Sequence, residues 1–422
     1  MPDDRNAIIH PKVMQKLLFI FASIFLIQSS VNAQQKNFTY KFYGFVRGDL
    51  YYNSRNNVEA VDGNFYLYPL DKAPDATGKD MNANPNGSFY TFTTRFGLDA
   101  TGPNVGSAKT TAKVEVDLGG FNLAHYTLRI RHAYVNMDWD KGSSLLLGQT
   151  WHPLFGDVMP EVLNLNTGGP FQPFNRSAQL RYQYKKNKIT LTASAVYQLM
   201  YLSTGPNGKS EEYLKNGVIP ELFAGITYRN NGFLGGFGIE MLSLKPRLNS
   251  THEGKTYKVS ERVTSVSLMA QAQYRADKLF LAGKTLLASN QTHTAMLGGY
   301  GVSSVDPATG EQEYTPSRHS TTWLNAVYGT NWKGNLFMGY SKNLGTTDKL
   351  VSVDRFYGSG VNIDQLLSVF AGLSYNLPHW KAGVEGSVTT AWYGDTDLSN
   401  GKVHNTHGVT NLRILGLLVY YF

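Results

Sequence analysis

The chain of 422 residues has only 17% charged side chains, together with 42 glycines, 26 tyrosines, 22 phenylalanines and no cysteine. The lack of cysteine excludes disulfides, thiol chemistry and a lipid-modified cysteine. The formal charge of +8 is spread along the chain without a basic run, which argues against a nucleic-acid partner.

The N-terminal region has the pattern of a secretory signal. The stretch from Leu17 to Ile27 is almost entirely apolar, and the small-residue sequence VNA follows it, ending at Ala33. The apolar stretch is too short for a transmembrane helix, which needs about 20 residues. We therefore predict a cleaved signal peptide over 1–33, with Met14 as the true start, and a single mature domain over 34–422.

The rest of the chain alternates between two kinds of side chain. In SVSLMAQAQYR, residues 265–275, every second residue is small or apolar, which is the period of a β-strand. No segment of useful length has a helical period. We predict sixteen strands, at 38–52, 88–101, 107–118, 126–138, 143–151, 176–185, 188–200, 219–229, 233–244, 260–275, 279–288, 320–331, 335–343, 363–376, 380–391 and 408–422.

The connections between these strands alternate between short and long. Tight turns such as KKNK, NNG and WKG take turns with long segments such as 53–87, 152–175 and 289–319. This alternation, with an even strand count, is typical of an antiparallel transmembrane β-barrel of the bacterial outer membrane, with turns in the periplasm and loops outside. Counts of 14 or 18 strands, and a large soluble sandwich, remain as alternatives.

The last predicted strand has one face without charge. Phe422, Tyr420, Leu418 and Ile414 share that face, which suits lipid and the aromatic girdle at the periplasmic interface. A terminal aromatic residue of this kind also resembles the signal that the barrel-assembly machinery recognises. We expect outer-membrane lipid and lipopolysaccharide to surround the barrel.

Basic residues gather on the lumen-facing positions of the first predicted strands. A ladder of positive charge on one wall would follow, because neighbouring strands stack these positions. We expect the wall to comprise Arg47, Arg95, Lys113, Arg129 and Arg131, with Arg181 further along.

The segment after the fifth strand is expected to fold into the lumen. It contains four prolines, several apolar residues, and the acids Asp157 and Glu161. An acidic loop opposite a basic wall would create a transverse field at a narrow point and so affect ion selectivity. Alternatively, the arginines pair with lumen acids such as Asp49, Glu115 or Asp117 and stiffen the wall; both roles remain open.

Four stretches are similar to one known family. They are KFYGFVRGDLYY at 41–52, LRIRHAYV at 128–135, LLLGQTWHPLFGDVMPEVLN at 145–164 and AQLRYQY at 178–184. Together they resemble the DcaP-like outer-membrane porins of Gram-negative bacteria. The resemblance implies a sixteen-stranded, homotrimeric diffusion channel whose arginine-lined constriction favours small anionic solutes such as dicarboxylates.

Other sites find little support in the sequence. His404 and His407 form an H-x-x-H pattern, but they lie outside any helix that would place both rings on one face. No G-x-S-x-G elbow is present for a hydrolase. We expect a passive porin, with no catalytic residues, cofactor or metal. The alternatives are an outer-membrane barrel enzyme of the lipase or protease type and a closed structural or adhesive barrel.

Overall fold

The computed structural model describes residues 38–60, 63–119 and 127–422. The predicted signal peptide and its cleavage site lie outside these residues. No helix among them has the length and apolar character that crossing a membrane would require.

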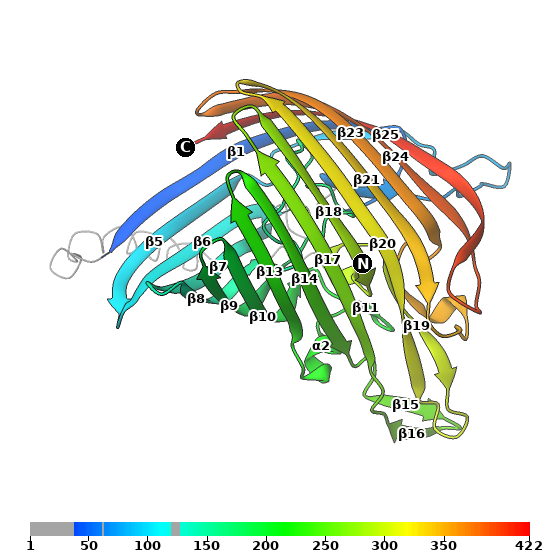
Figure 1. The fold of residues 1–422 in the computed structure, drawn as a ribbon. Helices are drawn as coiled ribbons and strands as arrows, with labels where there is room; N and C mark the ends of the chain where they lie inside the picture. Colours follow the sequence, from blue (N-terminus) through cyan, green and yellow to red (C-terminus); the bar gives the residue numbers. More distant parts are fainter. Residues whose placement is uncertain (1–37, 61–62, 120–126) are drawn as a thin grey trace, which may run out of the picture.

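The sixteen strands form a closed antiparallel barrel, as predicted (Figure 1). The ring closes because β1 pairs with β25, from Phe45 opposite Tyr421 to Asn53 opposite Arg413, and on its other edge with β4 and β5. In ring order the strands are β1 (Thr39–Asn53), β4 continued by β5 (Asn86–Tyr90 and Arg95–Val105), β6 (Ala108–Gly119), β7 (Thr127–Trp139), β8 (Ser143–Trp151), β9 (Arg176–Lys186), β10 (Ile189–Met200), β13 (Glu221–Asn230), β14 (Phe233–Leu244), β17 (Val263–Arg275), β18 (Leu279–Ser289), β20 (Gln312–Gly329), β21 (Trp332–Thr346), β23 (Ile363–Asn376), β24 (Trp380–Thr396) and β25 (Val403–Tyr421).

Tight turns and the C-terminus gather at one end of the barrel, and the long connections gather at the other (Figure 1). Gly232 shows why one turn is so short: its φ is +81°, and a Cβ there would lie 2.3 Å from the carbonyl oxygen of Arg275. The long connections contain the short elements β2 (Asn57–Ala60), β3 (Phe65–Pro69), β11 (Thr204–Gly205), β12 (Gly208–Lys209), α2 (Glu212–Gly217), β15 (Asn249–His252), β16 (Lys255–Lys258), η2 (Thr292–Thr294), β19 (Gly298–Val305), η3 (Val353–Arg355) and β22 (Phe356–Ser359).

The two faces of each strand differ as the alternation predicts. Leu128 and Ile130 of β7 are 64% and 52% exposed on the outer face, whereas Arg131 points inward and is 5% exposed. On β25 the exposed side chains include Ile414 and Phe422. The apolar belt is therefore on the outside and the polar side chains line the lumen, as in a membrane barrel.

Several predicted boundaries differ at the loop end of the barrel. β20 begins at residue 312 instead of 320, and β25 begins at 403 instead of 408. These extensions lie beyond the apolar belt, so they carry polar residues on both faces. They therefore lack the alternation of polar and apolar residues that marks a half-buried strand. The second strand is interrupted between β4 and β5, where Thr93 has a φ of +68°.

The hairpin of β2 and β3, which the sequence did not predict, packs among buried residues. Tyr393 of β24 donates a hydrogen bond to the carbonyl oxygen of Pro69 at 2.7 Å. The side-chain amide of Asn166 donates to the carbonyl oxygen of Tyr66 at 2.8 Å. The first long connection thus contacts both β24 and the segment 152–175.

Candidate functional site

The segment 152–175 is held by lumen-facing residues of distant strands. The backbone N–H groups of Leu163 and Asn164 donate to the carboxylate of Glu385 on β24 at 2.7 and 3.0 Å. The indole N–H of Trp323 on β20 donates to Gln172 at 2.9 Å. A carboxylate that accepts hydrogen bonds from two backbone N–H groups fixes the path of the segment, much as a side chain does at the N-terminus of a helix.

The same segment contacts strands on both sides of the barrel. Asp157 forms an ion pair with Arg229 of β13 at 2.7 Å. Arg47 of β1 donates to the carbonyl oxygen of Leu163 at 2.8 Å. Since β1 and β13 are the first and eighth of sixteen strands around the ring, the contacts of this segment extend across the lumen.

The two acids of the segment do not lie against the predicted basic wall. Asp157 pairs with Arg229, and Glu161 pairs with Arg275 of β17 at 2.5 Å. Both arginines belong to strands beyond the wall of β1 and β5 to β9. The sequence analysis expected these acids to face the basic wall. The structure does not bring Asp157 and Glu161 together with Arg129 and Arg131.

Three cations of the predicted wall pair with nearby acids. Arg47 contacts Asp49 at 2.7 Å, and Lys113 contacts Asp99 at 2.6 Å. Arg95 lies 3.5 Å from Glu115. These three cations keep between 15% and 26% of their side-chain surface exposed, so their positive charge remains accessible from the lumen.

Arg129 and Arg131 share an acid, and Arg131 is the more deeply buried of the two. Asp117 accepts from Arg129 at 2.9 Å and from Arg131 at 2.9 Å, and Arg131 also contacts Glu115 at 2.7 Å. A register shift opposite Glu115 turns His132 inward beside Arg131, which breaks the strict alternation of β7. The pairing that the sequence left open is thus present at this position.

Two further arginines of β9 differ from the others. Within the described part of the chain, neither Arg176 nor Arg181 forms an ion pair with a carboxylate. Arg181 instead donates to Gln179 at 2.9 Å and to the carbonyl oxygen of Trp151 at 2.6 Å. Arg176 is 1% exposed, with its guanidinium 4.7 Å from the centre of the Trp151 ring.

The sequence analysis missed Arg176. Side chains alternate between the two faces along β9, and this alternation assigns Arg176 to the outward face. The pairing of β9 with β10 shifts register between Tyr197 and Met200, opposite the start of β9. This irregularity places Arg176 among buried residues. The one signal in the sequence is its position directly after the proline-rich segment, where a strand is only beginning.

Two connected polar cavities lie beside Arg181. The larger, about 310 Å³, is lined by Ser143, Asp157, Gln183 and Arg229 among others. A narrower one of about 50 Å³ is also lined by Asp157 and Gln183, and adds Arg181. The largest cavity, about 1220 Å³, is mostly apolar and lies against outward-facing residues, so it is a groove on the lipid side and not a pore.

In the first long connection, a salt bridge joins Arg55 to Asp80 at 3.2 Å. The backbone N–H of Ala73 also donates to Asp80 at 3.0 Å. This hydrogen bond, helped by the positive charge of Arg55, lowers the pKa of Asp80 below its ordinary value. Asp80 therefore stabilises the connection that carries β2 and β3 as long as it is ionised.

The two histidines of the H-x-x-H pattern contact different acids. His404 lies 3.6 Å from Asp397, and His407 lies 2.7 Å from Asp71. Among the described residues, one group of three histidine and acidic side chains has converging ligand atoms, and it consists of His152, Glu221 and His293. The sequence analysis did not find this group.

Comparisons with known proteins place the fold. No family model and no curated protein sequence matches this chain. The crystal structure of the outer membrane channel DcaP of Acinetobacter baumannii is similar with a TM-score of 0.67 and 18% identity, over 92% of this chain and 99% of that one. The barrel has the fold of the outer-membrane porins.

Two other solved structures agree with this fold. The anion-selective porin from Comamonas acidovorans is similar with a TM-score of 0.52 and 11% identity, covering 91% of this chain and 100% of that one. OmpT, an outer membrane protein of Vibrio cholerae, has a TM-score of 0.54 and 12% identity, covering 92% and 99%. The predicted resemblance to DcaP-like porins, and the predicted outer-membrane barrel, are confirmed in the fold.

Proposed function

We propose that this protein is an outer-membrane porin, a passive diffusion channel for small hydrophilic solutes that favours anions such as small dicarboxylates. The observation that carries the proposal is an excess of positive charge on one lumen wall. The cations of this wall include Arg47, Arg95, Lys113, Arg129, Arg131, Arg176, Arg181 and Lys185, and its carboxylates include Asp49, Asp99, Glu115, Asp117 and Asp138.

The arginines were considered for two roles, which are attracting anions and stiffening the wall by pairing with acids. Different arginines suit each role. Arg129 and Arg131, held by Asp117 and Glu115, fix the geometry of the wall. Arg181 forms no ion pair among the described residues and lines the narrow cavity, where the nearby Asp157 is paired with Arg229, so Arg181 is well placed to attract anions. A surplus of positive charge in a confined space of low dielectric raises the local anion concentration and lowers the barrier to entry.

The segment 152–175 is proposed as the constriction of this channel. Its contacts with β1, β13 and β24 support the proposal, because they extend across the lumen next to the basic wall. The name of the similar Comamonas structure describes an anion-selective porin, which also supports the preference for anions. The names of the similar structures describe channels and porins, which favours a channel over a barrel enzyme.

We further propose a homotrimer in the outer membrane, in contact with lipid and lipopolysaccharide. A trimer form of the similar OmpT structure supports this assembly. Phe422 exchanges backbone hydrogen bonds with Gly44 at 3.1 Å while its ring stays 53% exposed. A terminal aromatic ring that remains accessible suits recognition by the barrel-assembly machinery, and deleting Phe422 should reduce assembly without affecting secretion.

Liposome swelling tests the channel proposal. Purified protein should admit a small dicarboxylate faster than a diamine of equal size, and should show no lipase or protease activity. The preference should weaken in 1 M salt, where electrostatic screening acts within about 3 Å. Swelling in neither solute would favour the closed structural barrel, and faster entry of the diamine would contradict the anion preference.

A further inference from the structure

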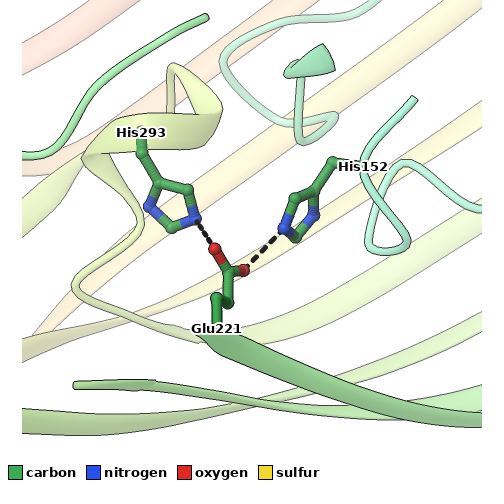
Figure 2. A group of neighbouring side chains, drawn as sticks. All are labelled: His152, Glu221 and His293. Carbon is green, nitrogen blue, oxygen red and sulfur yellow. Dashed lines mark ion pairs between the residues drawn. The ribbon is translucent and has the colours of Figure 1, made fainter. Parts of the chain in front are cut away.

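Two histidines and a glutamate meet inside the barrel (Figure 2). The Nε2 of His152 lies 2.6 Å from Oε1 of Glu221, and the Nε2 of His293 lies 3.1 Å from Oε2 of the same carboxylate. The three residues come from the start of segment 152–175, the first position of β13 and the short helix η2. All three side chains are fully shielded from solvent.

The polar atoms of this group are poorly satisfied. Apart from the two ion-pair contacts within the group, the carboxylate oxygens of Glu221, both ring nitrogens of His293 and the Nε2 of His152 have no hydrogen-bond partner among the described residues. Glu240 on the adjacent strand β14 is also fully buried, and its Oε1 has no hydrogen-bond partner either. Buried polar atoms of native proteins nearly always have a partner, so this site calls for one.

A second carboxylate makes the charge of the site unusual. Glu240 accepts a hydrogen bond from the side-chain amide of Gln291 at 2.8 Å, which leaves its other oxygen unpaired. Burying two neighbouring carboxylates without a matching positive charge is very costly. A divalent cation would neutralise both acids, and neutral imidazoles could ligate it at the same time.

We propose that His152, His293 and Glu221, with Glu240 beside them as a further acid, bind a divalent transition-metal ion of the zinc class. Two imidazole nitrogens and two carboxylate oxygens are a donor set that Zn²⁺ accepts in a closed tetrahedral site. Zinc–nitrogen bonds of about 2.0–2.1 Å put neighbouring donors roughly 3.3 Å apart at tetrahedral angles. The ligand atoms of His152, Glu221 and His293 already lie within 4.8 Å of one another, so small side-chain rotations suffice.

Binding would require one proton to move. The Nδ1 of His152 accepts a hydrogen bond from the backbone N–H of Leu154 at 3.2 Å, so in the metal-free protein the proton of a neutral ring is on Nε2. A cation bound to Nε2 would require the ring proton to be on Nδ1 instead. The hydrogen bond from the backbone N–H of Leu154 to Nδ1 would then be lost.

The proposed ion would join three parts of the chain. It would attach the beginning of segment 152–175 to β13 and β14 of the wall, and to η2 of the connection that follows β18. Of the side chains in the proposed site, only His152 lines one of the polar cavities near Arg181. The proposed metal site therefore does not depend on the proposed channel function. The expected consequence is a more rigid segment when the ion is bound.

Metal titration of the purified, folded trimer tests the proposal. After dialysis against a chelator, the wild-type protein should bind one equivalent of Zn²⁺ per chain, measured by elemental analysis. Co²⁺ in its place should show the intense visible absorption of a tetrahedral complex. The Glu221→Gln and His293→Gln variants should each lose at least about 100-fold in affinity, since even outer-shell partners contribute 10–100-fold.

His404→Gln is the matched control, because this histidine is exposed and pairs with Asp397 outside the proposed site. It should bind zinc as the wild type does. Heat-modifiable migration on gels verifies that each variant is folded, and Glu240→Gln provides a second test if either variant fails to fold. Less than one equivalent in the wild type, or equal affinity in folded Glu221→Gln and His404→Gln, would overturn the proposal.

Discussion

Two walls of the lumen differ in their chemistry. On β1 and β5 to β9, lumen-facing cations outnumber carboxylates, and Arg47, Arg95 and Lys113 keep part of their side-chain surface exposed. On β20 to β24 the inward residues are largely hydroxyl and aromatic: Ser368 and Thr389 share a hydrogen bond at 2.7 Å, and Trp323, Phe337 and Phe370 form a buried cluster with Val158 and Phe171 of the segment 152–175.

This difference indicates how a charged pore can coexist with a folded inner segment. The segment packs its apolar residues against the aromatic wall, where burial is favourable, and leaves the charged wall beside the polar cavities. Charges inside the aromatic cluster would have required desolvation, and the buried Glu385 of β24 offsets that cost by accepting two backbone N–H groups of the segment. Apolar residues on the first wall would have reduced its field. One wall therefore anchors the segment, and the other would face the solutes of the proposed channel.

Removing residues 154–172, while keeping β8 and β9, should have the largest effect on this arrangement. The deletion takes away the anchored segment and should increase single-channel conductance severalfold, because the lumen of a sixteen-stranded barrel is then open. Planar-bilayer recordings of the refolded protein provide the measurement. An unchanged conductance in a folded barrel would mean that the narrow point is elsewhere.

The double change Arg129→Glu and Arg131→Glu should mainly destabilise the protein. It places two acids against Asp117 and Glu115, and losing one partner of a buried ion pair already costs about 3–5 kcal/mol. We expect a lower yield of folded trimer and a lower unfolding temperature on heated gels.

The double change at Arg229 and Arg275 to glutamine is the matched control on the other side. Both arginines are half-exposed, and exposed ion pairs contribute at most about 1 kcal/mol each. Stability should therefore change little. Equal destabilisation by the two double changes would contradict the division between a rigid paired wall and exposed pairs.

A small effect is expected in the first long connection. Because the pKa of Asp80 is lowered in the folded protein, its stabilising contribution is complete above the ordinary pKa of about 4 and is lost as the pH falls through the lower folded value. Hydrogen exchange of residues 71–85 should be faster in Asp80→Asn than in the wild type at pH 6. That difference should vanish below about pH 3, and a difference that persists there would exclude the carboxylate as its cause.

Much of the fold could be predicted because the physical signal is local. Alternation identifies every strand whose faces meet lipid and water, and tight turns such as that at Gly232 mark one end of the barrel. The inward direction of Arg129, Arg131 and Arg181 follows from the same parity. Arg176 and His132 could not be found this way, because register shifts break the parity beside them.

The remaining differences depend on contacts between distant residues. The partners of Asp157 and Glu161 are Arg229 and Arg275, which nothing in the local sequence associates with them. The inward hairpin of β2 and β3 has the composition of an ordinary loop. His152, Glu221 and His293 are separated by more than a strand pair in sequence, so only the closed barrel brings them together.

The reversal potential in a KCl gradient tests the central claim most directly. The wild-type channel should be anion-favouring, Arg181→Gln should move the reversal potential toward zero, and Arg181→Glu should move it further toward cation preference. Lys109→Gln, at a turn where the lysine is exposed and pairs with Asp140, should leave it unchanged. A folded Arg181→Glu channel with the wild-type reversal potential would contradict the account.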